Sequence, residues 1–233
     1  FQIDDNTLQT FDKILRLYPL GPNGCRTGSR TFLEGIVVCV LKIFRNLPSH
    51  GNIPPLIDFL NVNPIVTLPE DVNSSILQAL HSVVRSSNYF ETEDSLEELP
   101  LEVSKQLLDL VTTAYLDKPD YTKIALEIIV DLDISDAIEI VAPFLHSTDE
   151  LCSVALYYLR DFWDEVYLET VAEIARRGDG SWTTLAAIRV LGDHGTGEYV
   201  EQLLVDLERY SSLSGRGYKR CRDAVEEALV NLR

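Results

Sequence analysis

Side chains that could bind a metal ion are present in this sequence, but their spacing does not favour a site. The four histidines are His50, His81, His146 and His194. None belongs to the H-x-x-x-H or H-E-x-x-H pattern that places ligands on one helix face for zinc. Asp149 and Glu150 follow His146 closely enough to join it as ligands if the fold brought the three together. We expect turn residues there and no metal site.

Phosphate binding and nucleophilic catalysis also lack their sequence patterns. Glycine-rich stretches occur at 21–29 and 192–197, but neither follows a strand pattern or carries the lysine of a phosphate-binding loop. No serine occupies a G-x-S-x-G elbow. Adjacent carboxylates such as Glu97-Glu98 are frequent because the chain has 37 acidic residues, so they do not indicate an acid–base pair. We expect no catalytic residue, no cofactor and no enzymatic activity.

The cysteines indicate a reducing compartment. Cys25, Cys39, Cys152 and Cys221 are far apart and form no C-x-x-C pair. Their low density is unlike that of disulfide-stabilised secreted domains, so we expect a cytoplasmic protein. Cys39 and Cys152 lie among apolar residues with helical spacing, and we expect both to be small core residues.

The charge of the chain disfavours two classes of partner, although acidity can also serve only to keep a protein in solution. Lys and Arg number 20 against 37 Asp and Glu, which gives a formal net charge of −17. The acidic excess lies between residues 61 and 210, where it would repel phosphate backbones and anionic lipid and attract basic partners. The apolar run at 35–44 (GIVVCVLKIF) is shorter than the roughly 18 residues that a membrane span needs. We therefore expect a protein partner with a basic segment, and neither nucleic acid nor a membrane.

Apolar residues recur with the helical period along the whole chain, and no alternating strand pattern competes with them. The early part predicts helices at 8–18, 30–46, 55–61 and 71–86, followed by an acidic loop at 88–100. After residue 100 the pattern predicts pairs of helices, and the first helix of each pair spans 101–117, 136–145, 165–177 or 198–210. Candidate N-caps are Asp71, Asp120, the cluster 147–149 and Ser181.

A repeated motif, Ala-[Leu/Ile]-x-x-[Ile/Leu]-x-Asp, marks the second helix of each pair. It begins at Ala125, Ala155 and Ala187, is truncated at Ala228, and has weaker copies at Ala79 and Cys39. The three full copies start 30 and 32 residues apart, which is the length of one helical hairpin. A small alanine lets a neighbouring helix approach closely, and stacking buries the apolar face that one hairpin leaves open. The repeats predict an all-α fold, an α-α superhelix, in one domain over 1–233, with irregular hairpins in 1–99 and regular ones in 100–233.

These repeats resemble HEAT-type helical repeats, particularly the short variety of phycobilin-lyase-like proteins. Residues 185–204 (LAAIRVLGDHGTGEYVEQLL) carry the resemblance best, and 136–145 (DAIEIVAPFL) looks like the first helix of that family with its internal proline. Arg222 stands where HEAT repeats carry an arginine that pairs with turn aspartates, but the other repeats hold Pro119, Asp149 and Ser181 there. The resemblance is clearest over 100–233 and implies a HEAT/ARM-like superhelix whose second helices line a concave surface.

Helix geometry predicts which residues of the second helices face away from the core. At 100° per residue, positions −5, +2 and +6 from the motif alanine lie opposite the apolar positions. These positions hold Asp120, Glu127, Asp131, Glu150, Tyr157, Asp161, Trp182, Arg189 and Asp193. With the concavity that the resemblance implies, they predict an acidic groove in which Tyr157, Trp182 and Arg189 anchor a partner. The alternative is a solvated face with acids at helix caps and aromatics half-buried between repeats.

The sequence therefore favours a non-enzymatic scaffold or adaptor that binds a basic or extended protein segment. One variant is an immunity or inhibitor protein that neutralises a basic toxin. The alternative from another class is a HEAT-like enzyme, either a cofactor or chromophore lyase or a DNA glycosylase, and the acidic charge opposes the glycosylase. The basic stretch 216–222 (RGYKRCR) could dock an anion, or could simply begin the last helix with its charges paired to Asp223 and Glu226.

Overall fold

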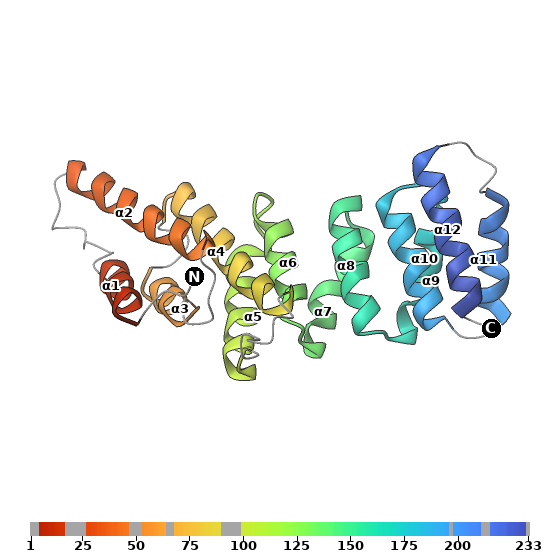
Figure 1. The fold of residues 1–233 in the computed structure, drawn as a ribbon, viewed down its shortest axis with the longest axis horizontal. Coiled ribbons are helices and arrows are strands. Elements are labelled where there is room, and N and C mark those ends of the chain that lie inside the picture. The colour runs from red at the N-terminus through yellow and green to blue at the C-terminus, as the bar shows by residue number, and fades with distance from the viewer. Residues whose placement is uncertain are drawn as a thin grey trace. The chain divides into compact units, whose positions relative to one another are not determined.

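The computed structural model describes residues 5–16, 27–46, 53–63, 68–89, 99–195, 198–210 and 215–231. Every regular element within these ranges is a helix (Figure 1), so the predicted all-α fold class is confirmed. None of the helices described there has both the length and the hydrophobicity that crossing a bilayer requires.

The chain divides into two compact units, Phe1–Asp133 and Ile134–Arg233. The helices of the first unit are α1 (Asp5–Arg16), α2 (Thr27–Asn46), α3 (Ile53–Val62), α4 (Glu70–Tyr89), α5 (Leu101–Tyr115) and α6 (Thr122–Asp131). The predicted early helices correspond to α1 to α4, each within a few residues. This unit boundary differs from the predicted change of regularity near residue 100, and the assignment of a single repeat domain stays a prediction.

The second unit consists of alternating first and second helices. Its α-helices are α7 (Ile138–Val141), α8 (Asp149–Asp161), α9 (Leu168–Arg176), α10 (Trp182–His194), α11 (Glu198–Tyr210) and α12 (Arg216–Asn231). Short 3-10 helices precede or follow two of them, namely η3 (Ser135–Ala137), η4 (Ala142–His146) and η5 (Glu165–Tyr167). The predicted first helix at 136–145 is interrupted because Pro143 lacks the N–H that an α-helix would bond to the carbonyl of Glu139.

The motif-bearing helices pack against one another within each unit. In the first unit α4 lies between α2 and α6, and in the second α10 lies between α8 and α12 (Figure 1). The motif alanines are fully buried at positions 79, 125, 155 and 187, and Ala228 is 2% exposed. The Leu or Ile at the next position is also buried in all five copies. The motif therefore forms the core between second helices, an arrangement consistent with an α-α superhelix.

Small residues set the distance between α10 and α12. A methyl group added at Gly192 would overlap the side chain and backbone of Ala228. At the other end of the same two helices, a methyl group at Gly217 would overlap the carbonyl oxygen of Gly180. Gly180 also has φ of +72°, a conformation that other residues rarely adopt. Both contacts depend on glycine, so a larger residue at Gly192 or Gly217 would push α10 and α12 apart.

One core prediction is wrong, and the reason is a shift of helical phase in α2. Cys39 is exposed, whereas Cys152 is fully buried as expected. The buried residues of α2 at this level are Val40, Leu41 and Phe44, which repeat the 0, +1, +4 pattern one residue later than the predicted copy. One residue rotates a side chain by about 100°, which is enough to move it from core to solvent.

One predicted N-cap residue is wrong, because the cap of α6 is Tyr121 and not Asp120. The cap of α8 is Thr148, which lies in the predicted cluster, but its side chain makes no capping hydrogen bond. Ser181 does cap α10, because its Oγ accepts a 3.1 Å bond from the backbone N–H of Thr184. Asp71 lies in the first turn of α4, where its carboxylate accepts from the N–H of Val72.

Several predictions fall outside the described residues. They concern His50, Cys25, most of the glycine-rich stretch 21–29, residues 196–197 of the second such stretch, and 90–98 of the predicted acidic loop. Asn88 and Tyr89 of that loop belong to α4.

Candidate functional site

The exposed face of α8, α10 and α12 is the candidate site in the second unit. All six residues predicted for this face on α8 and α10 are exposed, namely Glu150, Tyr157, Asp161, Trp182, Arg189 and Asp193. Trp182 is 61% exposed and Tyr157 48%, although both are large and apolar. Trp182 lies mostly in solvent, whereas Tyr157 is half-buried, as in the alternative of a solvated face. The helical phase therefore brings two aromatic rings and an arginine onto one surface.

Glu127 and Asp131 belong to the first unit and have a different environment. Both are partly buried on α6, and their carboxylates lie 3.8 Å and 3.5 Å from Nε2 of His81 on α4. His81 is at position +2 of the motif copy in α4, and Glu127 and Asp131 are at positions +2 and +6 of the copy in α6. All three groups therefore lie on the corresponding faces of their helices. These two acids are thus held by a neighbouring helix when the imidazole is charged, and are less available than those on α8 and α10.

Arg160 neutralises one of the predicted acids. Its Nε lies 2.7 Å from Oδ2 of Asp193 on the adjacent helix α10. The backbone carbonyl of Arg160 is also hydrogen-bonded to Nε2 of His194, whose ring stacks on Trp163 with centroids 5.5 Å apart. The C-terminal ends of α8 and α10 are therefore tied together. The face is of mixed charge here, which the count of acids at the predicted positions did not indicate.

A hollow of about 300 Å³ opens on this face between α10 and α12. Its lining consists of Arg160, Arg189, Gly192, Asp193, Ala224, Glu227, Ala228 and Asn231. Ala224 and Ala228 line it with methyl groups alone, and Gly192 lies against Ala228. The sequence does not predict Glu227 and Asn231 here, because the truncated motif copy at Ala228 is recognised by its apolar positions alone.

Trp182 carries a cation on its ring. The guanidinium carbon of Arg220, near the start of α12, lies 4.5 Å from the ring centroid. This distance is within the range of a cation–π contact. The basic stretch 216–222 therefore begins the last helix as the sequence indicates, and Arg222 lies within about 4 Å of both Asp223 and Glu226.

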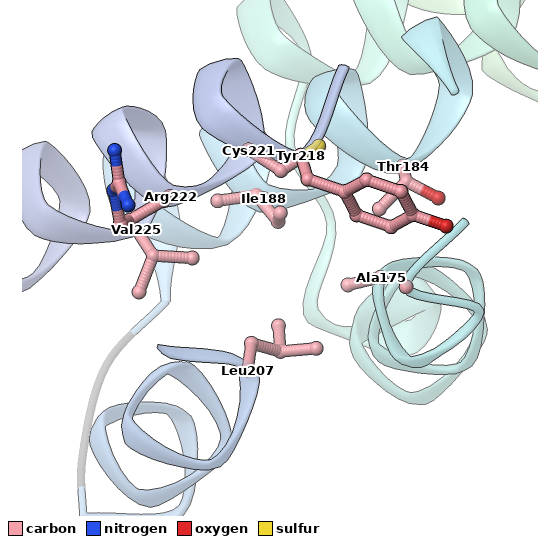
Figure 2. Close-up of a pocket in the computed structure, with 9 residues that line it drawn as sticks. Ala175, Thr184, Ile188, Leu207, Tyr218, Cys221, Arg222 and Val225 are labelled. Carbon is pink, nitrogen blue, oxygen red and sulfur yellow. The ribbon is translucent and has the colours of Figure 1, made fainter. Parts of the chain in front are cut away.

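A second, much smaller cavity lies inside the unit between α9, α10, α11 and α12 (Figure 2). Figure 2 shows Ile188, Leu207, Cys221 and Val225 among the side chains around it. Its volume of about 20 Å³ is enough for one water molecule and too small for a substrate. Burial raises the pKa of the Cys221 thiol, and the nearby Asp179 raises it further. The thiol therefore stays protonated and is a poor nucleophile.

Shifted pKa values elsewhere have structural causes. Burial raises the pKa of Cys152 to about 11, and its thiol donates to the carbonyl of Leu145. Burial alone would raise the pKa of Asp179, but hydrogen bonds from Ser181 and Thr184 outweigh it and leave the pKa below its ordinary value. None of these groups faces the hollow. In the described ranges no cluster of three or more His, Cys, Asp or Glu could hold a metal ion.

Comparison with known proteins gives a likeness of fold alone. No protein-family model matches the chain, and no curated protein matches it. The chain is similar in structure to an engineered protein solved by the Northeast Structural Genomics Consortium, with a TM-score of 0.52 and 14% sequence identity over 96% of each chain. Identity at this level supports the helical fold and carries no function.

Proposed function

We propose that this chain is a non-enzymatic scaffold or adaptor that binds a basic or extended segment of another protein. The binding surface is the face of α8, α10 and α12, with HEAT-like repeats as its framework and the cytoplasm as its location. The observation that carries the proposal is the exposure of Tyr157 and Trp182 beside Arg189 on one face of a well-packed unit. Tyr, Trp and Arg are the residue types that dominate binding energy at protein interfaces.

The charge of the chain supports a basic partner. A net charge of −17 would accelerate association with a positively charged segment and make it sensitive to salt. Glu150 and Asp161 are exposed on α8 beside Tyr157, so the aromatic ring has carboxylates on its own helix. A lysine- or arginine-rich segment could place its aliphatic stems on the rings and its charges on these acids.

The rigidity of the second unit supports an extended partner. Its second helices are fixed by fully buried motif residues and by the glycine contacts between α10 and α12. A stack of this kind presents separated anchors without losing conformational entropy on binding, so most of the ordering cost falls on the partner.

Affinity capture from a lysate of the source organism tests the proposal. The wild-type chain and a variant with Tyr157, Trp182 and Arg189 all changed to alanine are compared at about 50 mM and 500 mM salt. We expect one basic protein to bind the wild type at low salt, to dissociate at high salt, and to be lost from the variant.

A matched control carries alanine at Glu139, Val166 and Glu173, which are exposed on the first-helix side of the unit. This control should retain the captured protein. Equal capture by wild type and by the triple variant, with both folded by circular dichroism, would exclude the proposed face.

A further inference from the structure

We propose that the hollow between α10 and α12 receives a carboxylate and a nearby ammonium group of the partner segment, held by Arg189 and Glu227. This inference rests on the proposed function and names the chemistry of the partner at one place on the binding face. It differs from a purely basic partner, because the hollow requires one acidic group as well.

The charges around the hollow are unequally satisfied. Arg160 and Asp193 form an ion pair at 2.7 Å, so their charges cancel. Arg189 and Glu227 make no ion pair or hydrogen bond among the residues that the structure describes. They belong to facing helices and line the same space without coming within ion-pairing distance. The hollow therefore has one cation and one anion that are exposed to solvent and available to an external partner.

The shape of the hollow agrees with two small polar head groups. Gly192, Ala224 and Ala228 line it without projecting beyond a methyl group, which leaves the volume of about 300 Å³ open. Asn231 adds an amide that can both donate and accept on the same rim. A bulky apolar side chain would bury Arg189 and Glu227 without partners, at a high cost in desolvation.

The two groups select their ligands by geometry. A guanidinium such as that of Arg189 binds a carboxylate through two parallel N–H bonds. A carboxylate such as Glu227 binds an ammonium as a charge-assisted hydrogen bond. An acidic segment alone would leave Glu227 repelled, and a basic segment alone would leave Arg189 repelled. A segment with one Asp or Glu close to a Lys satisfies both.

Nuclear magnetic resonance titration of the full chain tests the inference with defined probes. The probes are acetate, butylammonium, 6-aminohexanoate and the blocked peptide acetyl-Glu-Gly-Lys-amide, followed through the side-chain N–H signals of Arg189 and Asn231. We expect the two doubly charged probes to reach half-saturation at a concentration about tenfold or more below that of either singly charged probe, because linked groups bind with a high effective concentration.

Two variants and two matched controls complete the experiment. Arg189→Gln and Glu227→Gln should each abolish the advantage of the doubly charged probes. Glu226→Gln, next in sequence but close to Arg222, and Arg176→Gln on α9, paired to Glu169, should leave it unchanged. Binding of 6-aminohexanoate without the blocked peptide would indicate a free amino-acid site and overturn the inference, as would equal binding of all four probes.

The outcome can be separated from that of the proposed function. In one outcome, changing Tyr157 and Trp182 abolishes partner capture, while Glu227→Gln changes neither capture nor the titration. That result would support the binding face and exclude the role of the hollow. Probe binding as described, with capture lost in Glu227→Gln but unaffected by alanine at Tyr157 and Trp182 together, would retain the hollow and remove the aromatic anchors of the proposed function.

Discussion

At the scale of single residues, the motif separates a constant core from a variable surface. The position of the motif alanine is buried in every second helix from α4 onward, whereas the residue two places later differs in chemistry each time. In the second unit this position is Tyr157, Arg189 and Val230, all exposed. Packing fixes the first position and leaves the second free, which is how a stack presents different side chains to a partner on one framework.

The glycine at 192 gives a residue-scale prediction. Gly192→Ala would force a methyl group into Ala228, so we expect the free energy of unfolding to fall by about 1–3 kcal/mol despite the better helix propensity of alanine. Denaturant unfolding measures the change.

Gly35→Ala is the matched control for this prediction, because a methyl group at Gly35 in α2 meets nothing within 4 Å. That change should stabilise the chain by about 0.5–1 kcal/mol. The double variant Gly192→Ala, Ala228→Gly should recover only part of the loss, because the Cα of residue 228 stays close to the added methyl group and glycine weakens α12. A Gly192→Ala protein as stable as wild type would show that α10 and α12 are not in this close contact.

At the scale of elements, the turn between α9 and α10 is organised by one carboxylate. Oδ1 of Asp179 accepts 2.9 Å and 2.8 Å bonds from the N–H of Ser181 and the hydroxyl of Thr184. Gly178 and Gly180 on either side have φ of +56° and +72°. The same turn contacts the start of α12 through Gly217. The orientation of Trp182 at the first position of α10 therefore depends on this turn.

Asp179→Asn tests the turn through its dependence on pH. The pKa of Asp179 is lowered in the folded chain, so its stabilising contribution is complete above the unfolded pKa and is lost as pH falls through the folded value. We expect the variant to be less stable by about 0.5–1 kcal/mol at pH 7, a modest value because the group is exposed.

Unfolding measured from pH 7 to pH 3 checks this prediction. The difference between the variant and the wild type should shrink below about pH 4, where the carboxyl of the unfolded chain becomes protonated. A difference that stays constant over the whole range would show that the charge of Asp179 does not stabilise the turn.

Sequence patterns predict the helices well and their details poorly. Every motif alanine and its following Leu or Ile is buried as predicted, because periodicity reports burial directly. The weak copy predicted at Cys39 begins one residue too early, since Cys39 and Val40 are both apolar and either could take the position of the motif alanine. The N-cap predicted at Asp120 is also wrong, because α6 begins one residue later and its N-cap is Tyr121. Residue preference alone does not determine where the turn ends.

The candidate site was predicted only in part, for a similar reason. Helical phase places Tyr157, Trp182 and Arg189 on the surface without reference to other helices. The contacts of Arg160 with Asp193 and of Arg220 with Trp182 join residues 33 and 38 positions apart in the sequence. No local pattern encodes such pairs, so the mixed charge of the face emerges only from the packing of α8, α10 and α12.

At the scale of the whole molecule, the account holds that partner binding is confined to the face of the second helices. Site-specific photocrosslinking in cells or lysate tests this most directly, with a photoreactive benzoylphenylalanine placed at Tyr157 or at Trp182 in one pair of chains and at Val166 or Glu173 in another. All four positions are exposed, so the side chain is tolerated at each. The account predicts one shared crosslinked protein from Tyr157 and Trp182 and none from Val166 and Glu173. Crosslinks of equal yield from both faces, or from the first helices alone, would contradict it.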